Sequence, residues 1–354
     1  MQRAIPAHVV TGPLGSGKTS AIAKLLATKP AAQNWVVLLN EFSDAGIDTL
    51  TIASAARGAF DVRLVPGGCL CCAGEQDFRR NLQELVTVTR PDRIIIEPSG
   101  LGHPGGIVEE LLGHESRGLL RLAGIVALVD PTNLRDGGPL PGTDAHAQVE
   151  IADALALSKP DLADDADRVR FAALVASLYP AKLWSGPLQG GMIPPEAFEP
   201  PQRHARELPE LRRPASHLAE RDSHEEQTGH AAEVPLQVPA AGHGLRSEVR
   251  HLGHRAVRWI FPRSVEFSRG RLQSLFATAG GDDDAADGGA RVARLKGVFR
   301  VGEDDWVLAQ SGNRFFDLRP TSWRRDNRVE LLLEDAAGFD VASWDATWLA
   351  CQRR

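Results

Sequence analysis

The sequence predicts an α/β fold with a mostly parallel sheet, followed by a smaller α+β domain. Short apolar runs alternate with helical patterns from residue 7 to about residue 186, as in sheets that helices cover on both faces. Within this part, Gly12–Thr19 (GPLGSGKT) places a Gly-rich loop between an apolar run and a helical pattern. From Arg255 onward strand-like runs dominate, which favours a second domain that contains a sheet.

The strands expected in the first domain are nearly continuous in apolar residues, as buried parallel strands are. They are Ala7–Thr11, Trp35–Asn40, Asp61–Val65, Arg93–Glu97, Gly124–Asp130, Ala154–Ser158 and Lys182–Trp184. The expected helices are Thr19–Ala27, Glu75–Val88, Ala145–Ala152 and Ala166–Leu178. Because ligands of parallel sheets bind at the carboxyl ends of the strands, we expect the site residues to follow these runs.

The expected domain boundaries follow from a change in composition. We expect a first domain over residues 1–188, a His-containing linker over 189–254 and a second domain over 255–354, because Pro, Glu, Arg and His replace the apolar periodicity in the middle stretch. Seven of the 11 histidines are dispersed between His204 and His254: His204, His217, His224, His230, His243, His251 and His254. Weak metal capture and a solvated linker are both open interpretations of these histidines.

The second domain is expected to combine strands with two helices. The strands are Ala256–Phe261, Arg291–Val301, Trp306–Gln310, Phe315–Leu318 and Arg328–Leu333, and the helices are Gly270–Ala279 and Ser343–Gln352. Cys351 stands alone in the second of these helices, so we interpret it as a packing residue.

Composition excludes several classes of protein. The formal net charge of −6 over 354 residues argues against nonspecific nucleic-acid binding. The sequence contains no run of 18 apolar residues, so no membrane-spanning helix is expected. The N-terminus leads directly into the first expected strand and leaves no room for a signal peptide. We therefore expect a cytoplasmic protein, as a monomer or a weak homodimer.

The Gly-rich loop fits the pattern G-x-x-x-x-G-K-[ST] at every fixed position. Backbone N–H groups of such a loop, together with the N-terminus of the following helix, bind phosphates. Lys18 would reach the β- and γ-phosphates, and the Thr19 hydroxyl would ligate Mg²⁺. The motif predicts binding of a nucleoside triphosphate, and the residues expected to contact it are Gly12, Gly15, Ser16, Gly17, Lys18, Thr19 and Ser20.

A second signal is Arg93–Gly100 (RIIIEPSG), an apolar strand that ends in an acidic residue. In P-loop enzymes the residue at this position helps to hold Mg²⁺, so Glu97 is expected there. The backbone N–H of Gly100 can reach the γ-phosphate.

A third signal is Ser158–Asp161 (SKPD), which follows an apolar run and is similar to the guanine-recognition motif N-K-x-D. Asp161 would accept hydrogen bonds from guanine N1 and N2, which adenine cannot donate. The stem of Lys159 would pack on the base. Ser158 stands in place of Asn and loses one hydrogen-bonding arm, so lower affinity with a retained preference for guanine is expected.

A fourth signal is the cysteine cluster in Pro66–Cys72 (PGGCLCC). Cys69, Cys71 and Cys72 offer thiolates, which bind Zn²⁺ or Co²⁺ well. Three sulfurs leave one position open, which Glu41, a histidine, water or a partner protein could fill. Packing of small apolar side chains and redox sensing are the alternative interpretations.

In this order the motifs resemble those of the CobW-like family of metal-related P-loop GTPases, over nearly the whole chain. The matching segments are GPLGSGKT at Gly12–Thr19, NEF at Asn40–Phe42, GID at Gly46–Asp48, GGCLCC at Gly67–Cys72, IIIEPSG at Ile94–Gly100, VALVDPTN at Val126–Asn133, SKPD at Ser158–Asp161 and RLKGVFRV at Arg294–Val301.

The resemblance implies a GTPase that uses Mg²⁺, with Lys18, Thr19 and Glu97 as catalytic residues, and that delivers zinc or cobalt to a client metalloprotein or metal-insertion enzyme. The chain departs from the family pattern at Ser43-Asp44 and Gly102-His103, near the expected metal site, so the ligands and the preferred metal stay open. His103 is either a ligand or a loop histidine. A small-molecule P-loop kinase and a nonenzymatic metal buffer with a structural nucleotide are the alternative functions.

Overall fold

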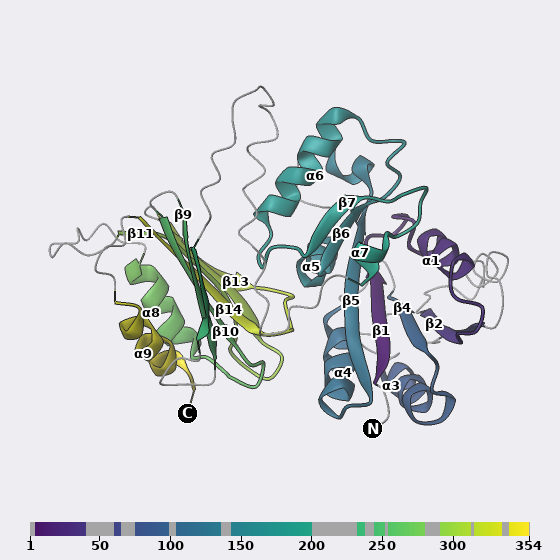
Figure 1. Ribbon diagram of the computed structural model, residues 1–354, viewed down its shortest axis with the longest axis horizontal. Helices are drawn as coiled ribbons and strands as arrows, with labels where there is room; N and C mark the ends of the chain where they lie inside the picture. The colour runs from purple at the N-terminus through teal and green to yellow at the C-terminus, as the bar shows by residue number, and fades with distance from the viewer. Residues whose placement is uncertain are drawn as a thin grey trace. The chain divides into compact units, whose positions relative to one another are not determined.

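The chain forms two compact units, Met1–Gln202 and Arg203–Arg354, shown in Figure 1. The structure is a computed structural model, and it describes residues 4–39, 60–64, 75–98, 104–135, 143–199, 232–237, 244–251, 254–279, 291–312, 315–334 and 340–353. Each unit has its own sheet and its own core.

Among the described residues, the first unit contains a seven-stranded sheet in the order β3-β2-β4-β1-β5-β6-β7. The strands are β1 (Ile5–Thr11), β2 (Trp35–Leu39), β3 (Phe60–Leu64), β4 (Arg93–Glu97), β5 (Leu120–Val129), β6 (Ala154–Leu157) and β7 (Trp184–Pro187). Every neighbouring pair is parallel. The predicted parallel α/β fold is confirmed.

Helices cover both faces of this sheet, as Figure 1 shows. Side chains of α1 and α7 share a buried cluster on one face, and side chains of α3, α4, α5 and α6 share the cluster on the other. The helices are α1 (Lys18–Ala27), α3 (Glu75–Glu84), α4 (Gly105–Ser116), α5 (Thr143–Ile151), α6 (Asp165–Ser177) and α7 (Pro195–Phe198). Two short turns accompany them, a π-helical turn at Leu85–Thr89 and the 3₁₀ turn η2 at Pro131–Leu134.

The two clusters explain why the strands are apolar throughout. In β4, Ile94 and Ile96 belong to one cluster and Ile95 to the other, as the alternation of side chains along a strand requires. Helices α4 and α7 are not among the expected elements. Three glycines within α4 (Gly105, Gly106 and Gly113) weaken its helical pattern, and α7 is too short to show a period.

His8 is a buried polar residue within β1. Its ring stacks on Phe198 of α7, with ring centroids 3.9 Å apart, and its Nδ1 lies 3.0 Å from the Phe198 carbonyl oxygen. The guanidinium of Arg93 donates to Nε2, so the ring proton is on Nδ1. Burial, and then the charge of Arg93, lower the pKa of His8 well below its ordinary value, and the ring is neutral.

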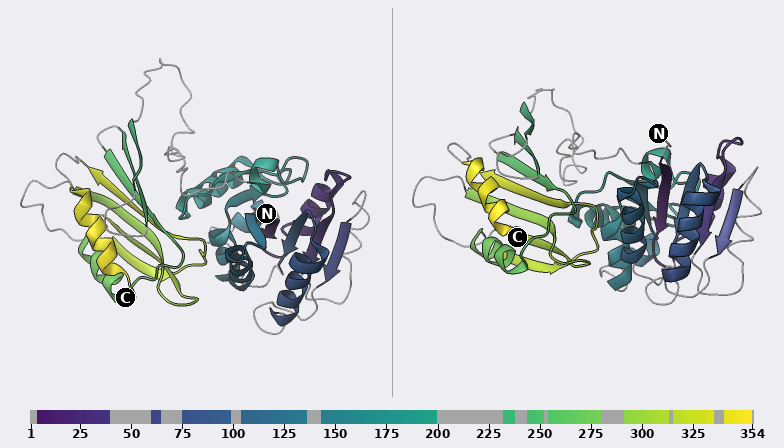
Figure 2. Two further views of the ribbon diagram at one scale, coloured as in Figure 1. Left: turned by 60° about the horizontal axis from the view of Figure 1, so that its bottom comes forward. Right: turned by 90° about the horizontal axis from the view of Figure 1, so that it is seen from below.

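The second unit contains an antiparallel sheet, seven-stranded in its described part, in the order β13-β12-β11-β14-β10-β9-β8. Its strands are β8 (Ala232–Gln237), β9 (Leu245–His251), β10 (His254–Phe261), β11 (Arg291–Arg300), β12 (Trp306–Gly312), β13 (Phe315–Pro320) and β14 (Asn327–Glu334). Helices α8 (Arg269–Ala279) and α9 (Val341–Cys351) lie side by side on one face, as Figures 1 and 2 show.

An aromatic cluster holds these helices on the sheet. Trp348 of α9 is fully buried and contacts Phe276, Phe299 and Trp259, with ring centroids 5.8 to 6.4 Å apart. Cys351 is buried in the same cluster, which confirms its interpretation as a packing residue. The α+β class of the second unit is likewise confirmed.

Parts of the stretch 189–254 differ from the expected linker. Its beginning contains α7, which packs on the first sheet, and its end contains β8 and β9, which pair with each other and, through β9, with β10. Pro235 within β8 argues against a strand in the sequence, and charged residues occupy much of β9, so neither segment is identified as a strand from its sequence.

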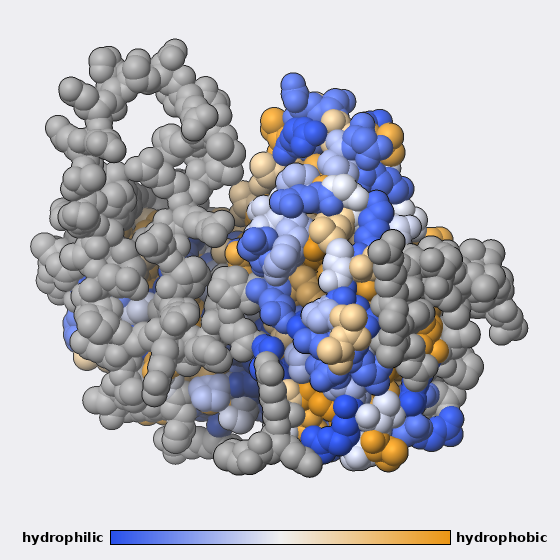
Figure 3. Space-filling model, turned by 45° about the vertical axis from the view of Figure 1, so that its right-hand side comes forward, coloured by the Kyte–Doolittle hydropathy of each residue, from blue (hydrophilic) through white to orange (hydrophobic). Residues whose placement is uncertain are grey.

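The described surface mixes polar and apolar side chains. Figure 3 shows orange apolar patches separated by blue hydrophilic ones on the face that it draws. Large apolar residues that are exposed in the first unit include Leu14 in the Gly-rich loop and Leu162. Within the described residues, no helix combines the length and apolar character that crossing a membrane requires.

Candidate functional site

The strand order places the candidate site at one edge of the first sheet. β1 lies between β4 and β5, and β6 is next to β5. Because these strands are parallel, their carboxyl ends meet at the same edge. Three of the sequence signals leave from these ends: the Gly-rich loop after β1, Glu97 at the end of β4, and Ser158 after β6.

The Gly-rich loop has the backbone of a phosphate cradle. Gly12, Gly15 and Gly17 have φ angles of +139°, +77° and +86°, which residues with a side chain rarely adopt. A Cβ at Gly12 would lie 2.5 Å from the carbonyl oxygen of Leu128 in β5, so the loop must pass close to that strand. A Cβ at Gly15 or Gly17 would meet no described atom within 4 Å, which leaves room for a ligand at the helix N-terminus.

Lys18, Thr19 and Glu97, the three expected catalytic residues, are brought together. The Thr19 hydroxyl donates to Glu97 Oε1 at 2.9 Å. Lys18 Nζ donates to the carbonyl oxygens of Gly12 and Pro13 at 2.9 and 3.1 Å, so its ammonium lies over the loop. Glu97 and Lys18 are buried.

This arrangement fits Mg²⁺ and phosphate. A hydroxyl and a carboxylate side by side are the hard oxygen ligands that Mg²⁺ prefers, and in P-loop enzymes the metal shares such ligands with the phosphates. Among the other expected contacts, Ser16 is buried and Ser20 is exposed. Gly100 lies outside the described residues.

The expected base-recognition residues form a tight turn after β6. Leu162 N donates to the Lys159 carbonyl at 2.9 Å, and Lys159 has φ +46°. Ser158 N donates to the Val129 carbonyl of β5 at 2.8 Å, which fixes the start of the turn on the sheet. Ser158 is buried, whereas Asp161 is exposed. A carboxylate in that position can accept hydrogen bonds from an incoming base.

Asp130, to which the sequence analysis gave no role, anchors Lys159. Its Oδ2 lies 2.6 Å from Lys159 Nζ, and its Oδ1 accepts from the backbone N–H and hydroxyl of Thr132. Burial would raise the pKa of the Asp130 carboxyl, but the hydrogen bonds from Lys159 and Thr132 produce a net lowering. Asp130 is therefore ionised and directs the Lys159 side chain across the end of β5.

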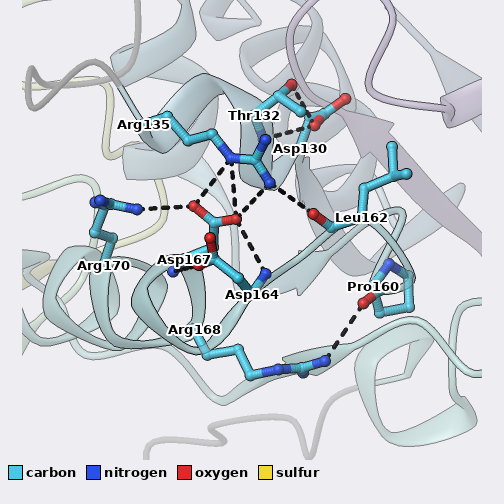
Figure 4. A network of polar contacts seen from close by, with 9 residues as sticks. All are labelled: Asp130, Thr132, Arg135, Pro160, Leu162, Asp164, Asp167, Arg168 and Arg170. Atoms are coloured by element: carbon cyan, nitrogen blue, oxygen red, sulfur yellow. Dashed lines mark hydrogen bonds and ion pairs between the residues drawn. The ribbon is translucent and has the colours of Figure 1, made fainter.

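A second group of contacts that the sequence does not predict surrounds Asp167, as Figure 4 shows. Arg135, which follows η2, donates to Asp167 and to the Leu162 carbonyl oxygen. The hydrogen bond from Arg135 lowers the pKa of Asp167. Of these two sets of contacts, the one around Asp130 has a sequence signal, because an Asp at the end of a strand and before Pro131 is typical of a cap. The contact between Arg135 and Asp167 has no such signal, because nothing in the sequence pairs Arg135 with a residue in α6.

The expected metal ligands lie outside the described residues. These are Glu41, Cys69, Cys71 and Cys72, and His103 lies outside them too. Within the described ranges, His, Cys, Asp and Glu side chains form no group of three that could hold a metal ion.

The strands that lead to these ligands are described, and they end level with Glu97. Leu39 of β2 lies opposite Leu64 of β3 on one side and opposite Glu97 of β4 on the other. With a strand spacing of about 4.8 Å, the backbone of Leu64 is about 10 Å from that of Glu97.

The chain is similar in sequence to known nucleotide-binding proteins. Residues 6–183 match the family model described as "CobW/HypB/UreG, nucleotide-binding domain". The chain is 29% identical over 354 residues to "Zinc chaperone YeiR" of Escherichia coli (strain K12), which covers 98% of this chain and 95% of that protein. It is 34% identical over 140 residues to "Zinc chaperone CobW" of Sinorhizobium sp, over 38% of this chain and 39% of that protein.

Among solved structures, the chain aligns with the Zn(II)-bound YjiA GTPase from E. coli. The alignment covers 99% of this chain and 100% of that chain, at 16% sequence identity and a TM-score of 0.44.

Proposed function

Because the chain belongs to the CobW/HypB/UreG family of nucleotide-binding domains, we propose that it is a GTP-hydrolysing metallochaperone. It binds zinc, or cobalt, through Cys69, Cys71 and Cys72 and transfers the ion to a client metalloprotein. Glu41 is the proposed further ligand. The names of the relatives, zinc chaperones in two organisms, support zinc as the cargo.

Hydrolysis is assigned to the residues at the ends of β1 and β4. Lys18 and the N–H groups of the Gly-rich loop hold the β- and γ-phosphates, and Gly100 is proposed to donate its N–H to the γ-phosphate. Thr19 and Glu97 hold Mg²⁺, which neutralises charge that develops on the phosphates. The hydrogen bond between Thr19 and Glu97 supports this assignment, since it brings both ligands to one point.

Guanine selection is assigned to the turn after β6. Asp161 accepts from N1 and N2 of the base, and the stem of Lys159 packs on the base plane while its ammonium stays on Asp130. Adenine offers no matching donors, so the exposed carboxylate discriminates against it.

One observation supports a link between the nucleotide and the metal. The strands β3, β2 and β4 end at the same height in the sheet. The segment with Cys69 follows β3 and the segment with Glu41 follows β2, so both begin at the edge where Thr19 and Glu97 meet. We infer that the nucleotide state controls metal affinity there, and that hydrolysis releases the ion to the client.

The test is a Zn²⁺ titration of the full chain with GTP, with GDP and without nucleotide. We expect Mg²⁺–GTP to tighten Zn²⁺ binding relative to GDP by about 1–3 kcal/mol, the usual coupling between linked sites, and Cys71→Ser to weaken binding in every state. Equal Zn²⁺ affinity in all three states, without phosphate release, would identify a passive metal buffer. Transfer of phosphate to a small acceptor without metal dependence would identify a kinase.

A further inference from the structure

The turn that carries Asp161 begins in a strained conformation. Lys159 adopts φ +46°, in the left-handed region that is unfavourable for a residue with a Cβ. The Leu162 N–H closes the turn on the Lys159 carbonyl at 2.9 Å. A residue persists in this region when its surroundings hold it there, so contacts from outside the turn matter.

Arg135 supplies such contacts from the neighbouring connection after β5. Its Nη2 donates to the Leu162 carbonyl oxygen at 2.7 Å. Its Nε and Nη2 donate to Asp167 Oδ2 at 3.1 and 2.8 Å, and Figure 4 shows the guanidinium lying between the turn and the helix. Asp167 lies in the first turn of α6 with a fully buried side chain. The planar guanidinium of Arg135 therefore bonds the turn and the helix at the same time. A lysine ammonium, which is a compact charge without a fixed fork of donors, cannot do this equally well.

The carboxylate that anchors Arg135 is itself fixed. Asp167 accepts from the backbone N–H of Asp164, which caps α6 in return. The hydrogen bond from Arg135 lowers the pKa of Asp167, and that carboxylate raises the pKa of Arg135. Both groups stay charged near neutral pH, so a change of pH in that range leaves this ion pair intact.

We propose that Arg135 is a positioning residue for base recognition, holding the Lys159–Leu162 turn so that the Asp161 carboxylate is presented to guanine. This rests on the proposed function, in which Asp161 selects the base. Two hydrogen bonds from one base edge must reach one carboxylate, so a displacement of the turn by about 1 Å weakens both of them. Arg135 acts through the turn rather than by touching the nucleotide.

The chain offers a matched control for this role. Arg170 donates to the same carboxylate, with its Nη1 2.8 Å from Asp167 Oδ1. The contact that distinguishes Arg135 is its bond to the Leu162 carbonyl. Removing Arg170 takes one positive charge from Asp167, as removing Arg135 does, but leaves that bond in place.

The experiment measures steady-state GTP and ATP hydrolysis by the full chain with Arg135→Ala, Arg135→Lys and Arg170→Ala. For Arg135→Ala we expect the KM for GTP to rise about tenfold, as for loss of one charged hydrogen bond, and the preference for GTP over ATP to fall with it. The kcat should stay within about twofold, because Lys18, Thr19 and Glu97 are untouched. Arg170→Ala should leave the KM for GTP unchanged.

Arg135→Lys keeps the charge and the alkyl stem but loses the fork, so it tests the proposal even if the alanine variant fails to fold. We expect its KM for GTP to rise by a smaller factor. Unchanged KM and base preference in both Arg135 variants would overturn the positioning role, as would equal shifts in Arg135→Ala and Arg170→Ala, or a fall in kcat at constant KM. If the unmodified chain hydrolyses GTP and ATP equally well, the proposed selection of guanine is wrong, and the positioning role of Arg135 is wrong with it.

Discussion

The hydroxyl of Thr19 donates a 2.9 Å hydrogen bond to Glu97 Oε1, which joins the first turn of α1 to the end of β4. The two residues are far apart in the sequence, and the parallel pairing of β1 with β4 brings them together. The pair therefore forms only when the central strands are correctly assembled.

The first prediction concerns Mg²⁺. Thr19→Ala should abolish measurable GTP turnover, and Glu97→Gln should slow it and raise the Mg²⁺ concentration required, because each removes an oxygen proposed to hold the ion. A phosphate-release assay over a range of Mg²⁺ concentrations checks this. Thr19→Ser, which keeps the hydroxyl, is the control. Full turnover in Thr19→Ala with unaltered Mg²⁺ dependence would contradict the assignment.

The second prediction concerns the base. Asp161→Asn should remove most of a GTP-over-ATP preference that we expect to be at least about tenfold, or about 1.4 kcal/mol, because the amide offers a donor to guanine N1–H and N2–H₂ where an acceptor is needed. Competition against a fluorescent nucleotide measures the preference. Asp165→Asn changes another exposed carboxylate nearby, in the first turn of α6, and should have no effect. Equal binding of GTP and ATP by the unmodified chain would disprove guanine selection.

The third prediction concerns the Gly-rich loop. Gly12→Ala should destabilise the first unit by about 3 kcal/mol or more and prevent nucleotide binding, because the new Cβ would meet the Leu128 carbonyl oxygen at 2.5 Å and Ser16 Oγ at 2.9 Å. Gly15→Ala is the matched variant: it is also strained, at φ +77°, but meets no described atom within 4 Å. It should destabilise by about 1–2 kcal/mol. Urea unfolding of both variants checks the difference, and equal losses would show that close approach to β5 is unimportant.

The fourth prediction concerns pH and His8. Its pKa is lowered in the folded protein, while the unfolded chain binds a proton near pH 6.5. As the pH falls below about 6.5, the unfolded state takes up the proton first. The first unit should therefore lose stability, by up to about 1.4 kcal/mol per pH unit.

Urea midpoints between pH 7.5 and pH 5.5 measure this loss, and His8→Gln should flatten the dependence in that window. The variant removes the titrating ring and leaves Arg93 and Glu199 in place. If wild type and variant lose stability in parallel, His8 is not the group responsible.

The local signals in the sequence predict the elements that carry the chemistry. The expected strand Arg93–Glu97 is found with those bounds, and the helix after the Gly-rich loop begins at Lys18, one residue before the expected start. Buried parallel strands are apolar on both faces, and loop glycines with positive φ angles have few substitutes. Both features can be seen in a short window of sequence.

Other features depend on contacts between residues that are far apart in the sequence. Arg135 and Asp167 meet because β5 and β6 are neighbours, and Asp130 gains its role from Lys159, which follows the neighbouring strand β6. The strands β8, which contains Pro235, and β9, which is largely charged, are held by pairing with the rest of their sheet. Such contacts follow from strand order, which composition and periodicity do not specify.

The position of β1 in the middle of its sheet has a consequence for synthesis on the ribosome. β1 pairs with β4 and with β5, which ends at Val129. A nascent chain that has emerged only as far as α1 contains the complete Gly-rich loop but neither strand that supports it. At about 5–20 residues per second, several seconds separate translation of that loop from the earliest moment at which it can bind a nucleotide. Cys69, Cys71 and Cys72 are translated within that interval, so the thiols of the proposed metal site are made before the proposed control by a nucleotide can begin.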